Sequence, residues 1–170
     1  MVLRPLHNIA MAPSRKKLDA ASPQTQLNGF IDKYTSEVAA TARGSLKKMR
    51  ARLPGAIQLV YDNYNALAIG FSPSERSSEA IFSIVLYPRY VTLFFLQGKN
   101  VPDPNMLLQG SGKIVRTIRL ESASDLDKSA VKQLIGAALK SAKVPIDHKA
   151  KNKLIIRAVL AKQRPRRPTK

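Results

Sequence analysis

The chain has 170 residues, which is enough for one ordinary hydrophobic core and short for two. It contains no cysteine, so disulfides, thiolate nucleophiles and cysteine metal sites are excluded, and a reducing, cytoplasmic location is expected. The longest apolar stretch, residues 81 to 97, is interrupted by Pro88 and Arg89, and neither half is long enough to cross a bilayer. We therefore expect no membrane partner.

The formal net charge is +18, and most of it lies in the C-terminal third. Residues 126 to 170 hold thirteen Lys or Arg against two acids. Such a field attracts polyanions and raises their rate of encounter. Nucleic acid is the first expected partner and an acidic protein the second, while the oligomeric state stays open.

The N-terminal region shows no apolar periodicity through residue 26, so residues 1 to 26 are expected to form a flexible arm, within which Met11 is an alternative start. From about residue 28 to Leu53, apolar side chains recur at three- and four-residue steps. This spacing predicts one amphipathic helix that ends at Leu53-Pro54-Gly55.

Four β-rich segments follow at residues 57 to 61, 66 to 71, 80 to 87 and 90 to 97, separated by turn-forming residues. Their spacing predicts an antiparallel meander, with a fifth strand at 114 to 120. A second helix is expected after a capping box made by Ser124 and Asp127, and it stops before Pro145.

The apolar run at residues 154 to 160 predicts a sixth strand, although its short length also allows a helix. The basic end, residues 162 to 170, is expected to be disordered. The fold expectation is thus a single α+β domain over residues 27 to 161, with an antiparallel sheet of five to six strands and two helices packed on one face.

Several segments of this chain resemble those of the YdhG-like family, whose fold is related to that of frataxin. The resemblance covers roughly residues 28 to 143. It rests on IDKY at 31 to 34, LPGA at 53 to 56, AIFSIVLYP at 80 to 88 and GSGKIVRTIRL at 110 to 120. It implies a frataxin-like α-β-α order, and it brings no agreed active site with it.

The same resemblance implies an alternative function as an iron or iron–sulfur accessory protein. Such a role needs exposed carboxylate ligands. The first helix offers only Asp32 and Glu37 among six Lys or Arg, and the loop after the first strand reads Tyr61-Asp62-Asn63-Tyr64-Asn65 in place of the family's Gly/Pro-containing aromatic loop. No metal ligands or cofactor are assigned.

Catalytic motifs are weak in this sequence. Gly110-Ser111-Gly112-Lys113 resembles a phosphate loop, but the full pattern needs a glycine at 107 and Ser or Thr at 114, so a plain turn is favoured. His7 and His148 are the only histidines, and neither is placed as a general base. We expect no catalytic residues; an enzyme with an unrecognised pocket is the third alternative.

Two candidate surfaces remain for an anionic partner. One is a basic stripe on the second helix together with the tail, which can neutralise phosphates or merely keep the protein soluble. Its residues are Lys128, Lys132, Lys140, Lys143, Arg164, Arg166 and Arg167.

The other candidate is an aromatic and cationic surface, which forms if the first and third hairpin turns fall at the same end of the sheet. The alternative is that these tyrosines only complete the edge of the core. Its residues are Tyr61, Asn63, Tyr64, Arg89 and Tyr90.

Overall fold

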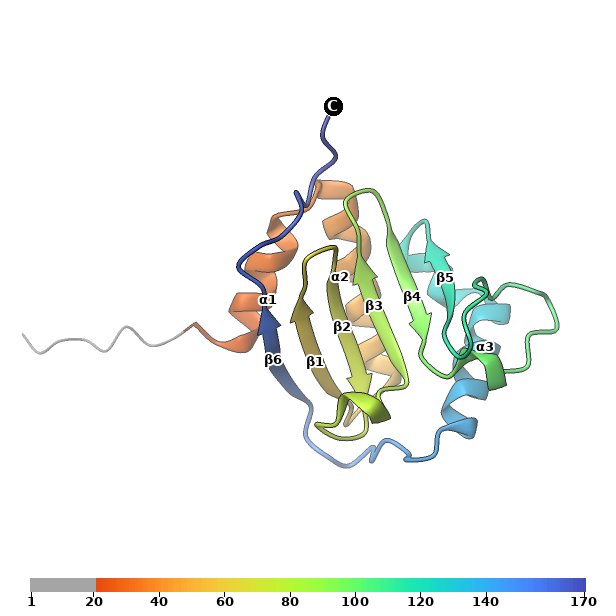
Figure 1. The fold of residues 1–170 in the computed structure, drawn as a ribbon. Coiled ribbons are helices and arrows are strands. Elements are labelled where there is room, and N and C mark those ends of the chain that lie inside the picture. Colours follow the sequence, from red (N-terminus) through yellow and green to blue (C-terminus); the bar gives the residue numbers. More distant parts are fainter. Residues whose placement is uncertain (1–20) are drawn as a thin grey trace, which may run out of the picture.

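The structure is a computed structural model that describes residues 21–170 (Figure 1). The expectations for residues 1 to 20, including Met11 and His7, lie outside the described residues. The expected flexible arm is too long, because helix α1 begins within it at Pro23. Ser22 accepts a hydrogen bond from the Thr25 N–H and so caps this helix, and a proline is well suited to the first helical position.

The single helix predicted from 28 to 53 is two helices, α1 (Pro23–Asp32) and α2 (Ser36–Arg52). The break lies at residues 33–35, where Thr35 leaves the helical conformation and its hydroxyl accepts the Val38 N–H. The apolar spacing runs through this break without interruption, because Ile31, Tyr34 and Val38 all face the core. Periodicity alone therefore could not reveal the junction.

The sheet has six strands in the order β5-β4-β3-β2-β1-β6. Their bounds are β1 (Ile57–Asp62), β2 (Leu67–Ser72), β3 (Phe82–Leu86), β4 (Val91–Phe95), β5 (Arg116–Leu120) and β6 (Lys153–Val159). The expected meander of β1 to β5 is antiparallel, but β6 runs parallel to β1, so the sheet is mixed. A long connection through α3 makes this possible, since parallel neighbours need a crossover.

The second helix begins later than predicted. Ser122 and Asp125 form the capping box, in place of Ser124 and Asp127, and they start a 3-10 segment at Ala123–Asp127. Helix α3 (Ser129–Ser141) follows it. Leu126 in the 3-10 segment is fully buried, so this turn contributes to the core as well as to the connection.

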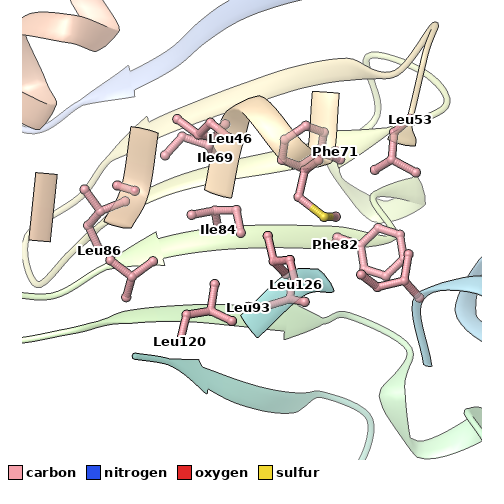
Figure 2. Packing of buried hydrophobic residues seen from close by; sticks show 14 of the residues in the cluster. Leu46, Leu53, Ile69, Phe71, Phe82, Ile84, Leu86, Leu93, Leu120 and Leu126 are labelled. Carbon is pink, nitrogen blue, oxygen red and sulfur yellow. The ribbon is translucent and has the colours of Figure 1, made fainter. Parts of the chain in front are cut away.

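The core is formed by the three helices and one face of the sheet, and Figure 1 shows the helices behind the strands. Figure 2 shows Leu46 and Leu53 of the α2 region meeting Ile69, Phe71 and other strand residues. Successive residues of a strand point to opposite faces of the sheet. The residues that alternate with these core positions therefore lie on the other face, among them Ala68, Ser83, Val85 and Phe94. None of the helices α1, α2 and α3 covers that face; only the short 3-10 turn Ser77–Glu79 lies at its lower edge (Figure 1).

Candidate functional site

A cavity of about 1060 Å³ lies over the open face of the sheet. Its floor comes from alternate positions of β1 to β4, namely Leu59, Tyr61, Ala68, Val85 and Phe94. Leu59 is 1% exposed and Val85 is 5% exposed, although neither belongs to the core under the helices. The sheet thus presents an apolar and aromatic floor on the side opposite its main core.

The first wall of the cavity consists of two hairpin turns. The β1–β2 turn contributes Asn63, Tyr64 and Asn65, and the β3–β4 turn contributes Pro88 and Arg89. Both turns lie at the same end of the sheet because β1 and β3 run in the same direction. The geometric condition for the aromatic and cationic surface is therefore met.

The second wall is the C-terminal strap, which we define as residues 160–168. Its main chain bonds to the β1–β2 turn: the Leu160 N–H donates to the Asp62 carbonyl and the Arg164 N–H donates to the Tyr64 carbonyl, both at 2.9 Å. The Gln163 side-chain amide also donates to the Asp62 carbonyl at 3.2 Å. The prediction of a disordered tail is wrong for this segment, because these bonds and the burial of Arg166 hold it against the domain.

Arg166 anchors the strap. Its guanidinium lies 2.8 Å from the Asp62 carboxylate, and the two side chains are only 4% and 1% exposed. The same guanidinium donates to the carbonyls of Asn63 and Tyr64. The expectation that Arg166 contacts an anionic partner is therefore wrong: its charge is already neutralised inside the protein.

The Arg166 guanidinium also lies 5.8 Å from the ring centroid of Tyr34. The Tyr34 hydroxyl donates to the Leu86 carbonyl and accepts the Leu67 N–H, each at 3.1 Å. Burial raises the pKa of Tyr34 to about 12, against a smaller opposing effect of Arg166. Tyr34 therefore stays neutral and ties the α1–α2 junction to β2 and β3.

Among residues 21–170, the cationic groups at the cavity are Arg89, Arg164 and Arg167, and no acidic side chain lines it. All three are exposed, and none forms an ion pair within residues 21–170. The Arg167 Nε donates to the Lys33 carbonyl at 3.2 Å, which fixes its direction without cancelling its charge. The strap thus brings two of these three uncompensated charges to the sheet face.

Four aromatic rings line the cavity, those of Tyr61, Tyr64, Tyr87 and Phe94. Arg164 lies 5.5 Å from the ring centroid of Tyr64, within cation–π range. The pKa of Tyr87 is raised by burial and, to a smaller extent, by neighbouring Tyr90.

Tyr90 does not line the cavity itself; it lines an adjoining groove with Tyr87, Phe94 and Arg119. Its ring lies 4.9 Å from that of Tyr87 and 4.5 Å from the Arg119 guanidinium.

The lysine stripe of α3 is not brought to this site. Lys128 pairs with Asp125 at 2.8 Å, and Lys132 and Lys140 are exposed without lining the cavity. Lys143 lines a separate, smaller cavity of about 290 Å³ between the end of α3 and the β3–β4 side of the core. The two candidate surfaces expected from the sequence are therefore separate in the structure. Arg164 and Arg167 lie with the aromatic surface, away from the lysines of α3.

The remaining motifs stay apart from the cavity. Residues 110–113 form an exposed approach to β5, in which Gly110 has a φ of +116° and Arg116 Nη1 donates to the Gly112 carbonyl. His148 is exposed in the connection between α3 and β6. In the described part of the chain, no three His, Asp or Glu side chains gather as a metal site.

The sequence analysis did not identify the floor residues Leu59, Val85 and Phe94. A signal was present, since β3 and β4 carry apolar side chains on both faces while helices were expected on one face only. Apolar residues on a face that no helix covers point to a ligand or partner surface.

A scan of protein-family models, a search of curated proteins and a search of solved structures each found no match to this chain. The helices among residues 21–170 are all too short or too polar to span a membrane.

Proposed function

We propose that this chain is a non-enzymatic, cytoplasmic binding domain that engages nucleic acid across the open face of its sheet. The observation that carries the proposal is the lining of the large cavity, to which the described part of the chain contributes three arginines, no acidic side chain and a floor of apolar and aromatic residues. Arginine is well suited to phosphate because its planar guanidinium donates in pairs and is weakly hydrated. The net charge of +18 adds long-range attraction for a polyanion.

An acidic protein remains the second class of anionic partner. The cavity favours nucleic acid over it, because ring faces beside arginines match bases beside phosphates. The YdhG-like and frataxin-like assignments, with their iron or iron–sulfur alternative, rest on sequence resemblance, and no observation at the cavity favours them. No observation at the cavity favours an enzymatic activity either.

The test is a titration of labelled single- and double-stranded DNA and RNA at several salt concentrations. One variant carries Arg89→Gln, Arg164→Gln and Arg167→Gln. Its control carries Lys132→Gln, Lys140→Gln and Lys143→Gln on α3, so both lose the same net charge. Any difference between them reports on the position of the charges.

We expect the arginine variant to bind more weakly. The magnitude of its slope of log affinity against log salt should fall by about 2, because three phosphate contacts are removed and each contributes about 0.7 on a single strand. The lysine variant should keep most of its affinity. A larger loss of affinity in the lysine variant would show that the binding site lies on α3. Absence of binding by the intact chain even at low salt would refute the proposal.

A further inference from the structure

We infer that the cavity takes an unpaired nucleic-acid strand, whose bases stack on its aromatic rings while its phosphates meet the rim arginines. This inference rests on the proposed function and names its ligand more narrowly. It excludes a duplex and a featureless polyanion as the best ligand.

The four rings of the cavity lie on its floor and at its turns. Tyr61 and Phe94 rise from β1 and β4 on the open face, and Tyr64 and Tyr87 stand at the two hairpin turns. Bases inside a duplex have both faces stacked on neighbouring bases, so they have no free face to offer to a ring. A floor of rings that is sunk between turns and strap is therefore accessible only to bases that have left a duplex.

Two of the peripheral rings, those of Tyr64 and Tyr90, are each paired with a cation. Arg164 lies 5.5 Å from the Tyr64 ring, and Arg119 lies 4.5 Å from the Tyr90 ring in the adjoining groove. A nucleotide joins a flat base to a phosphate, so a ring beside an arginine can meet both parts at once. One pair lies in the cavity and the other in the groove that shares Tyr87 and Phe94 with it, so a strand of more than one nucleotide can use both.

The size of the cavity and the polar groups at its edge also suit an unpaired strand. Its volume of about 1060 Å³ is at the upper limit of pockets for single small molecules, which extend to about 1000 Å³. The amides of Asn63 and Asn65 at its edge can both donate and accept, as the edges of unpaired bases require. Polyphosphate would use the arginines and leave the rings and amides without a partner.

The chain provides its own probe of stacking. It has five tyrosines and no tryptophan. Tyr34 is buried at 1% exposure, while the other four line the cavity or its adjoining groove. Bases that stack on these rings should quench the intrinsic tyrosine emission of the full chain, whereas inorganic polyphosphate should not.

The experiment compares single-stranded RNA, single-stranded DNA, the matched duplex, polyphosphate and poly-glutamate at equal charge concentration. The variants Tyr64→Leu and Phe94→Leu keep an apolar side chain but remove a ring face. Each should weaken single-strand binding about tenfold, the order expected for one lost stacking contact, and leave polyphosphate binding unchanged. Thermal unfolding of each variant confirms that the fold is retained.

The outcomes separate this inference from the proposed function. Tight single-strand binding with quenching, and loss in both ring variants, would support it. Equal binding of polyphosphate and single strands, or tighter binding of the duplex, would overturn it while the proposed anion site survives. Preference for poly-glutamate would replace it with an acidic protein partner, and no binding of any ligand would remove both proposals.

Discussion

Arg164 and Arg166 stand two positions apart in one basic run, yet the structure gives them opposite environments. Arg164 is exposed at the cavity, and Arg166 is buried against Asp62. The sequence places Asp62 in a turn and the arginines in a tail, and no local pattern links positions separated by about a hundred residues. This contact could not be predicted because it depends on how β6 pairs.

At this scale we predict that Arg166→Met lowers the free energy of unfolding by about 3 to 5 kcal/mol, because it leaves the Asp62 carboxylate buried without its main partner. Arg164→Met should change it by no more than about 0.5 kcal/mol, as an exposed substitution. Urea unfolding measures both. Equal effects of the two substitutions would show that the buried pair does not form in solution.

A double variant makes the assignment sharper. Asp62→Leu combined with Arg166→Met removes both charges, so its cost should be clearly smaller than the sum of the two single costs. Additive costs would mean that the two side chains do not interact.

The elements themselves were largely readable from local pattern. The strands at 57 to 61, 66 to 71, 80 to 87, 90 to 97 and 114 to 120 all overlap observed strands, because alternation and turn residues mark them. The run at 154 to 160 is a strand, but its parallel pairing with β1 was missed. An apolar run indicates that a segment is buried, but it does not indicate which strand the segment pairs with. The sheet edge that β6 joins therefore depends on the whole fold.

Two glycines allow a matched test of how the connections are packed. Gly55 has a φ of +84°, and a Cβ there would lie 1.9 Å from the Asp147 carbonyl oxygen in the segment that leads to β6. Gly55→Ala should therefore cost at least about 2 kcal/mol.

Gly136 of α3 has open space, so Gly136→Ala should stabilise the protein by about 0.5 to 1 kcal/mol. Thermal unfolding followed by circular dichroism measures both glycine variants. A neutral Gly55→Ala would contradict the close approach of residue 147.

At the scale of the whole molecule, several residues of the candidate site could be predicted from the sequence, but which of them lie together could not. Tyr61, Asn63, Tyr64 and Arg89 meet at one cavity because two turns share an end of the sheet, a condition that the sequence analysis stated. The α3 lysines are separated from that cavity because α3 packs on the covered face. A run of basic residues in the sequence shows only that they are close along the chain. Whether they form one site depends on which face of the sheet each side chain lies on.

The high net charge leads to a prediction about salt at this scale. Like charges repel in the folded chain, so added salt should raise the unfolding temperature of the free protein. With a saturating nucleic-acid strand the unfolding temperature starts higher by mass action, and it should then fall as salt weakens binding. Thermal scans across a salt series should show the two curves converging. Parallel curves would argue against binding driven by phosphate contacts.

The crossover to β6 also sets an order of events during synthesis on the ribosome. A nascent chain released as far as α3 holds every residue of the antiparallel meander β1 to β5, and with them Asp62 and the floor of the cavity. It lacks all three arginines of the strap, Arg164, Arg166 and Arg167. Premature termination in this region would therefore yield a product whose Asp62 carboxylate keeps Lys33 but lacks its buried partner Arg166, and the wall of the cavity would be completed only when residues 160–168 emerge.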